Sequence, residues 1–371
     1  LADRLVPWTL GGTALTYLLT RNVTKMLAVL MVDFSCALKL SMPIAVLSAM
    51  RESSSYHISV KGGRFLEAVS KADTVVFDKT GTLTYATPKV AQIVTFGGHE
   101  ASEMLRLAAC LEEHYPHSMA NAVVDEAKRQ NLKHEEYHSQ VQYVVAHGIS
   151  SMVEGKKVLI GSAHFVFEDE GCVILPEDQN AFDSLPGKYS HLYLAAGGVL
   201  AAVICISDPL RQEAADAVAA LRQLGVSKIV MLTGDSERTA AAIAEQVGVD
   251  EYRSEVLPED KARFVQEERA QGRTVVMIGD GINDSPALSA ANVGVAISDG
   301  AAIAREIADI TIAADDLFEL VKLRALSSAL MRRIRANYRF VIGFNGTLIA
   351  LGAMGVLAPA TSAMLHNLST L

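Results

Sequence analysis

Three short apolar runs, each followed directly by an acidic motif, limit what this chain can fold into more than any other feature of its sequence. Each run has the length of a buried strand, and each is followed by a stretch with helical patterning. This alternation is typical of a parallel β-sheet whose strands are joined by crossover helices. Because active sites of such sheets lie beyond the carboxyl ends of the strands, we expect the three motifs to converge. The runs and their motifs are Thr74–Phe77 before Asp78, Lys228–Leu232 before Thr233-Gly234-Asp235, and Thr274–Ile278 before Gly279-Asp280.

The side chains at these strand ends suit phosphoryl transfer. A carboxylate such as Asp78 can attack the terminal phosphoryl group of ATP when a cation neutralises the repulsion between the two anions. Asp280 and Asp284 supply oxygen ligands of the kind that Mg²⁺ prefers. Thr233 and Lys261 are candidates to bind the phosphoryl oxygens, the lysine as a point charge. The sequence therefore predicts that Asp78 accepts a phosphoryl group in a magnesium-dependent reaction.

Long apolar runs indicate that part of the chain lies in lipid, since half of its residues are hydrophobic and its mean hydropathy is +0.24. We predict membrane spans over residues 5–20, 26–50 and 340–357, and the start of a fourth span over 361–371. Basic residues stand at the inner ends of these runs, so the positive-inside rule places residues 51–339 in the cytoplasm. The net charge of −9 argues against nucleic acid as a partner.

Three polar side chains, Asp33, Ser35 and Cys36, interrupt the second predicted span. Polar and thiol groups inside a span are costly and are usually functional. Asp33 and Cys36 are three residues apart and can share one face of a helix. One thiolate with a carboxylate and a hydroxyl favours a harder divalent ion such as Mn²⁺ or Zn²⁺ over Cu⁺. In the alternative interpretation, Cys36 is only a small hydrophobic residue.

The motifs DKTGT, TGD and GDGxND, in this order after three strands, resemble the haloacid dehalogenase superfamily and, within it, the P-type ATPases. The resemblance covers nearly the whole chain. It implies an α/β fold with a haloacid-dehalogenase-like doubly wound parallel sheet as phosphorylation domain, an inserted α+β nucleotide-binding domain, and flanking transmembrane helices. Soluble phosphatases of the superfamily carry an acid/base aspartate where this chain has Thr80, so an aspartyl phosphate should last longer here. The resemblance assigns catalysis to Asp78, Lys79, Thr80, Thr82, Thr233, Gly234, Asp235 and Lys261, and Mg²⁺ binding to Asp78, Thr80, Asp280 and Asp284.

The inserted region resembles the small nucleotide-binding domain of the heavy-metal-transporting (type IB) P-type ATPases. Glu112 and His117 have the spacing of that subfamily, although the proline expected after the histidine is absent, and His114 is a nearby competitor. Together with Gly148 and Gly161, they are expected to surround the adenine and ribose of ATP. The implied domains are transmembrane helices over 1–50, a stalk and the first part of the phosphorylation domain over 51–88, the nucleotide-binding domain over 89–204, the second part of the phosphorylation domain over 205–330, and a stalk with transmembrane helices over 331–371.

The resemblance further implies ATP-driven export of a transition-metal cation through a bacterial plasma membrane. Ser35 and Cys36 match the family's Cys-Pro-Cys position, and His366 lies where related pumps carry ligands, so these residues and Asp33 are the expected transport site. ATP, Mg²⁺ and the transported metal ion are the expected ligands, and the lipid bilayer and a cytosolic metal donor are the expected partners.

Two other functions remain open from the sequence alone: a membrane-tethered phosphatase of the same superfamily, and a P-type pump for another ion such as K⁺ or a proton. The family's actuator domain carries a Thr-Gly-Glu loop, and no such motif is found in this chain. By family order the loop belongs before Leu1. The chain is therefore expected to be a fragment that binds ATP but does not transport on its own.

Overall fold

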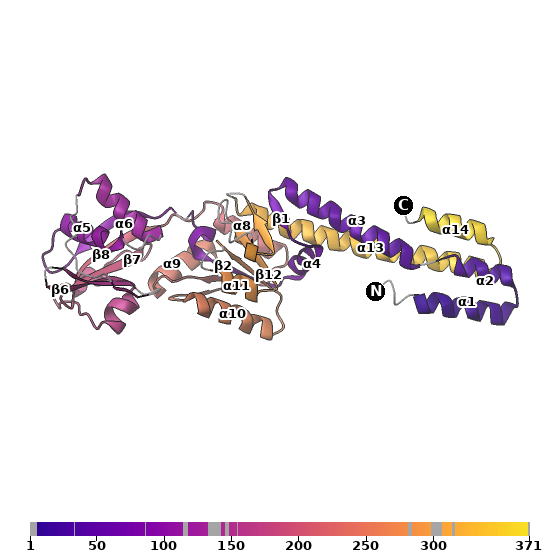
Figure 1. Ribbon diagram of the computed structural model, residues 1–371, viewed down its shortest axis with the longest axis horizontal. Coiled ribbons are helices and arrows are strands. Elements are labelled where there is room, and N and C mark those ends of the chain that lie inside the picture. Colours follow the sequence, from indigo (N-terminus) through magenta and orange to yellow (C-terminus); the bar gives the residue numbers. More distant parts are fainter. Residues whose placement is uncertain are drawn as a thin grey trace. The chain divides into compact units, whose positions relative to one another are not determined.

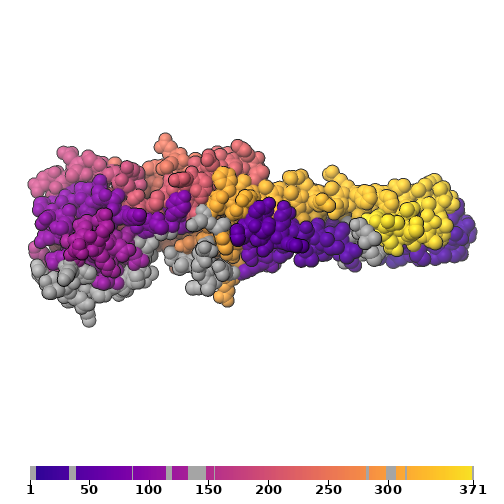
Figure 2. Space-filling view, turned by 90° about the horizontal axis from the view of Figure 1, so that it is seen from above, coloured from indigo at the N-terminus to yellow at the C-terminus, as the bar shows by residue number. Residues whose placement is uncertain are grey.

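The chain forms two compact units, residues 1–71 with 322–371 and residues 72–321. Figure 1 shows their helices and strands, and Figure 2 shows that helices from the N-terminal and C-terminal parts of the chain, in indigo and yellow, both belong to the first unit. The computed structural model describes residues 6–32, 34–85, 87–113, 118–132, 142–144, 148–153, 155–280, 284–297, 306–313 and 316–369. For residues 34–38, 118 and 142–144 it describes the backbone alone.

Parallel strands form the centre of the second unit, in the order β13-β12-β11-β2-β9-β10. Every residue of β2 is buried, as expected for a strand that is covered on both faces. The chain passes from β2 to β9 in one direction and returns across the sheet to β11, so β2 lies at the point where the strand order reverses. The strands are β2 (Thr74–Asp78), β9 (Lys228–Leu232), β10 (Glu251–Arg253), β11 (Val275–Gly279), β12 (Val293–Ile297) and β13 (Ile310–Ile312).

Helices cover both faces of this sheet, which confirms the predicted doubly wound architecture. Right-handed crossovers place α8 and α9 on one face and α10 and α11 on the other. On the second face, Val265 of α10 and Ala287 of α11 pack against Val76 of β2 and Met277 of β11. The helices are α8 (Ala214–Gln223), α9 (Glu237–Val247), α10 (Pro258–Ala270) and α11 (Ser285–Ala290).

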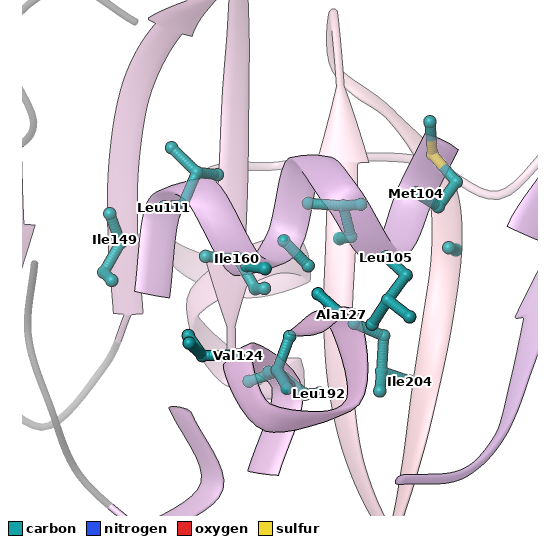
Figure 3. Close-up of a cluster of buried hydrophobic side chains, with 14 of the residues drawn as sticks. Met104, Leu105, Leu111, Val124, Ala127, Ile149, Ile160, Leu192 and Ile204 are labelled. Carbon is teal, nitrogen blue, oxygen red and sulfur yellow. The ribbon is translucent and has the colours of Figure 1, made fainter. Parts of the chain in front are cut away.

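An antiparallel sheet is inserted between β2 and β9, with the strand order β3-β8-β7-β6-β5-β4. Two helices, α5 and α6, pack on one of its faces, and Figure 3 shows the apolar core between them and the strands, including Leu105, Leu111, Ile149 and Ile204. The predicted α+β insertion is therefore present. Its elements are β3 (Lys89–Thr95), α5 (Ala101–Glu112), α6 (Ser118–Arg129), β4 (Gln142–Val144), β5 (Gly148–Val153), β6 (Lys156–Gly161), α7 (Gln179–Asp183), β7 (Ser190–Ala196) and β8 (Val199–Ser207).

Helices dominate the first unit. The run 26–50, predicted as one continuous span, is divided into α2 and α3, because Met31 caps α2 and the Val32 N–H bonds back to the Val29 carbonyl. In the part of the chain that the structure describes, no helix is both long enough and apolar enough to cross a membrane. The elements are α1 (Val6–Thr20), α2 (Val23–Leu30), α3 (Phe34–Ser55), β1 (Ile58–Val60), α4 (Gly63–Lys71), α13 (Phe318–Met354) and α14 (Pro359–Leu368).

The end of α13 differs from the predicted span end at residue 357. Gly355 adopts a left-handed backbone with φ +84°, a conformation that favours glycine. Its N–H donates to the Gly352 carbonyl, and the Val356 N–H donates to the Leu351 carbonyl. These two bonds form a Schellman motif, which ends the helix at Met354.

The helices of the first unit expose apolar side chains and bury polar ones. Trp8 is 80% exposed and Leu19 is 76% exposed, whereas Asn345 is fully buried and Ser362 and His366 are buried with it. This is the reverse of the usual distribution in a water-soluble bundle, in which apolar side chains form the interior.

Candidate active site

Asp78, Lys261 and Asp284 form a buried ion triad at the carboxyl edge of the parallel sheet. The Lys261 ammonium donates to Asp78 Oδ1 at 2.6 Å and to Asp284 Oδ1 at 2.8 Å. Asp78 ends β2, Lys261 lies in the first turns of α10, and Asp284 precedes the first residue of α11. All three are buried, with exposed fractions of 5%, 7% and 1%. The structure thus brings together three predicted site residues from three separate segments.

The ionisation of Asp78 depends on this environment. The pKa of Asp78 is raised to about 7, mainly by burial; Lys261 lowers it, and the charges of Asp284 and Asp280 raise it further. Burial alone would lower the pKa of Lys261, but attraction to Asp78 and Asp284 outweighs burial and raises it. Lys261 therefore remains protonated at neutral pH, and the charge of Asp78 responds to pH near neutrality and to an added cation.

A tight turn over residues 79–83 follows Asp78. Gly81 has φ +74°, which favours glycine, and its N–H donates to Thr84 Oγ1 at 3.0 Å. Thr80 is half-buried in this turn, directly beside Gly81. Thr82 is fully buried, and its carbonyl accepts a 2.9 Å hydrogen bond from Arg211 Nε. The DKTGT segment is therefore held in a defined conformation.

Lys79 and Asp235 form a second ion pair, with 2.6 Å between Lys79 Nζ and Asp235 Oδ2. Thr233, predicted to bind phosphoryl oxygens, donates its hydroxyl to Asp235 Oδ2 at 2.9 Å. Burial raises the pKa of Asp235, but Lys79 and the hydroxyl donors outweigh burial and lower it, so Asp235 is ionised. Ser190 of β7 donates to Asp235 Oδ1 at 2.7 Å. Ser190 is not predicted from the sequence, because a serine at the start of a strand carries no signal of its own.

The triad offers oxygen ligands for Mg²⁺. Asp284 Oδ2 is buried and has no hydrogen-bond partner among the described residues. Asp280, which follows β11, is close enough for its charge to raise the pKa of Asp78. No group of three or more His, Cys, Asp or Glu side chains in the described ranges is arranged to hold a metal by itself. Mg²⁺ suits such a site, because it takes one or two carboxylates and completes its shell with water and substrate phosphate.

The predicted nucleotide residues lie at one end of the inserted sheet. Gly148 of β5 stands directly opposite Gly161 of β6. Glu112 is the last residue of α5 and is buried, and its neighbour Leu111 shares the core with Ile149 of β5 (Figure 3). The structure therefore brings Glu112, Gly148 and Gly161 to one region. His117 and its competitor His114 lie outside the described residues.

Replacing Gly148 with alanine is expected to lower both ATP affinity and stability. An added Cβ would lie 2.5 Å from the Ile160 carbonyl oxygen and 2.5 Å from the Phe165 ring, so the strand must move. Overpacking of this kind costs about 1–3 kcal/mol. Thermal unfolding and ATP titration would measure both effects. Gly62→Ala is the control, since its Cβ would meet only the Phe65 ring at 3.9 Å. Equal stability and equal ATP affinity in the two variants would contradict this prediction.

The expected transport residues are only partly described. Asp33 lies outside the described residues, and for Ser35 and Cys36 only the backbone, within α3, is described. His366 is buried on α14, and its Nδ1 lies 3.2 Å from the Asn345 Oδ1 on α13.

The sequence of this chain is similar to a known protein family and to several curated proteins. Residues 72–292 match the haloacid dehalogenase-like hydrolase family. Three curated relatives are the zinc-exporting P-type ATPase of Mycobacterium marinum (36% identical, 99% of this chain and 50% of the relative), the manganese-exporting P-type ATPase of Mycobacterium leprae (35%, 98% and 50%), and the probable copper-exporting P-type ATPase V of Mycobacterium tuberculosis (36%, 98% and 48%). The chain thus spans about half the length of these relatives.

A solved structure is also similar over nearly the whole chain. The crystal structure of a zinc-transporting PIB-type ATPase in the E2.Pi state matches 99% of this chain and 60% of its own, with 32% identity and a TM-score of 0.69.

Proposed function

This chain belongs to the haloacid dehalogenase-like hydrolases, and we propose that it is the catalytic part of a P-type ATPase that exports a transition-metal cation. The observation that carries the proposal is the buried triad, in which Lys261 joins the Asp78 and Asp284 carboxylates at the carboxyl edge of the sheet. Its relatives are named for zinc, manganese and copper export, which supports metal transport as the purpose of the reaction.

In the proposed reaction, Asp78 attacks the γ-phosphoryl group of ATP, a new bond to phosphorus forms, and ADP leaves. Lys261 holds one carboxylate oxygen of Asp78 and stabilises the charge on the transferring group. Mg²⁺, held by Asp280 and Asp284, would neutralise the repulsion between the two anions. Glu112, Gly148 and Gly161 bind the nucleoside end of ATP in the inserted domain.

Thr80 distinguishes this proposal from the phosphatase alternative. A soluble phosphatase needs an acid/base carboxylate near the aspartyl phosphate, and the threonine hydroxyl cannot fill that role near neutral pH. An aspartyl phosphate on Asp78 is therefore expected to accumulate, as a pump requires when it couples phosphorylation to movement.

Labelling with [γ-³²P]ATP tests the proposal. We expect an acid-stable, hydroxylamine-sensitive phosphoenzyme, with the label on the peptide that contains Asp78. Rapid turnover of small phosphate esters without accumulation of such a species would instead support the phosphatase.

The distribution of apolar and polar side chains in the first unit supports a membrane location for this protein. A helical unit that exposes Trp8 and Leu19 and buries Asn345 and His366 suits lipid better than water. In the proposed arrangement, residues 51–339 face the cytoplasm, and the transported ion is bound by Asp33, Ser35, Cys36 and His366. A cytosolic metal donor would deliver the ion.

The transported metal can be identified from ATPase stimulation of the full-length protein by Mn²⁺, Zn²⁺, Co²⁺ and Cu⁺. We expect the strongest response to Mn²⁺ or Zn²⁺ and a loss of about tenfold or more in apparent metal affinity for Cys36→Ala, because a ligand is removed. Cys172→Ala removes a thiol from the inserted domain and serves as control. Equal stimulation of both variants would exclude Cys36 from the transport site.

A further inference from the structure

Ser190 connects the inserted sheet to the ion pair beside the phosphoryl acceptor. It is the first residue of β7 and is 6% exposed. Its hydroxyl donates to Asp235 Oδ1 at 2.7 Å and lies 3.4 Å from the Lys79 ammonium. Lys79 directly follows Asp78 in the chain, so a side chain of the inserted domain reaches to within one residue of the acceptor.

Three donors, two hydroxyls and one ammonium, contact the two oxygens of the Asp235 carboxylate. Oδ2 accepts from Thr233 Oγ1 and pairs with Lys79 Nζ, while Oδ1 accepts from Ser190 Oγ. Because both oxygens of the Asp235 carboxylate are bound, a single orientation of this carboxylate makes all three contacts. Without Ser190, Oδ1 would lose this donor, and the carboxylate would be less firmly held opposite Lys79.

The backbone around Ser190 is fixed against the start of α9. Thr239 Oγ1 donates to the Tyr189 carbonyl at 2.9 Å, and Arg238 Nη1 donates to the Asp183 carbonyl at 3.1 Å. A Cβ added to Gly187 would lie 3.2 Å from Arg238 Cγ, so the two segments are closely packed. These neighbours place the Ser190 hydroxyl at Asp235 independently of its own hydrogen bond.

We propose that Ser190 is a positioning residue for phosphorylation, whose hydroxyl orients Asp235 and through it Lys79, so that the reaction at Asp78 depends on contact with the inserted domain. The inference rests on the proposed function. In this role Ser190 acts through Asp235 and Lys79 rather than by binding ATP itself. Its effect is therefore expected on the rate of phosphorylation rather than on ATP affinity.

Rapid-quench measurement of phosphoenzyme formation in the full-length protein tests this role, alongside equilibrium binding of ATP. Hydrogen bonds to charged groups are strong enough that Ser190→Ala should slow phosphorylation about tenfold at saturating ATP. ATP affinity should stay within about twofold of wild type. Ser190→Thr retains the hydroxyl and should restore the rate to within about threefold.

Ser184→Ala is the matched control. Its hydroxyl donates to the Asn180 carbonyl within the inserted domain, and Ser184 is not among the described residues that hold the Asp235 carboxylate. A double-mutant cycle with Asp235→Asn adds a second readout, because Ser190→Ala should have little further effect once Asp235 is changed. A structural role alone would reduce ATP affinity and would add fully to the effect of Asp235→Asn.

The outcomes separate this inference from the proposed function. Absence of phosphoenzyme in the wild-type protein would overturn the proposed function and the inference with it. A normal wild-type phosphoenzyme combined with an unchanged rate in Ser190→Ala would overturn only the role of Ser190. Equal slowing by Ser190→Ala and Ser184→Ala, or failure of Ser190→Thr to restore the rate, would also overturn it.

Discussion

Replacing Asp78 with asparagine is expected to abolish the acid-stable phosphoenzyme completely. The amide cannot act as the nucleophile, and Asp284, the other carboxylate bound to Lys261, belongs to a different element and is proposed to hold Mg²⁺. ATP binding should persist, because the predicted nucleotide residues lie in the inserted sheet. Asp216→Asn on the exposed surface of α8 is the matched control and should be labelled normally. Labelling of Asp78→Asn at the wild-type level would show that another residue accepts the phosphate.

The same substitution is expected to change how stability depends on pH in Mg²⁺-free buffer. The pKa of Asp78 is raised from 3.8 to about 7 by burial first, and then by the neighbouring acids. The folded protein therefore holds a proton between these values that the unfolded chain releases. The contribution of Asp78 to stability is present below about pH 4 and is lost as the pH rises through about 7.

Thermal unfolding of wild type and Asp78→Asn over this pH range measures the effect. The stability of wild type relative to the variant should fall as the pH rises from about 4 through about 7, because wild type progressively loses the proton that its folded state holds. A difference that does not change with pH would contradict the raised pKa of Asp78.

The second large effect is expected for Lys261→Met, which preserves an unbranched side chain and removes the charge. Asp78 and Asp284 would then face each other without the ammonium that they share. Removing one partner of a buried ion pair typically costs about 3–5 kcal/mol. The rate of phosphoenzyme formation should fall by about 10²–10³, the usual loss when a donor to the transferring group is removed.

Denaturant unfolding and rapid-quench labelling measure the two effects of Lys261→Met. The loss of stability should be greatest above pH 7 and smaller at lower pH, where protonation of Asp78 removes the repulsion. Lys71→Met is the control, because Lys71 forms an exposed pair with Glu67. Similar behaviour of the two variants would show that Lys261 is not a member of the catalytic centre.

The order of the strand-end motifs was sufficient to predict the parallel sheet and the convergence of Asp78 with Asp284. Parallel strands buried on both faces need uninterrupted apolar runs, and their carboxyl ends meet at one edge, so this arrangement follows from local pattern and chain order. A separate inserted domain was also predictable, because the sequence between the first and second strands is long enough to form one; its α+β character was implied by the family resemblance.

Other features were decided only by tertiary packing. The hydrogen bond from Thr233 to Asp235 is one of them, since the short loop after β9 places the threonine hydroxyl beside the Asp235 carboxylate. The run 26–50 broke into two helices at a cap that apolar composition does not reveal. Ser190 lies at Asp235 because the inserted domain packs against the start of α9. Such a long-range contact produces no periodic pattern in the sequence. Sequence patterns report the burial and direction of local segments, whereas the partner of each polar side chain depends on where distant segments meet.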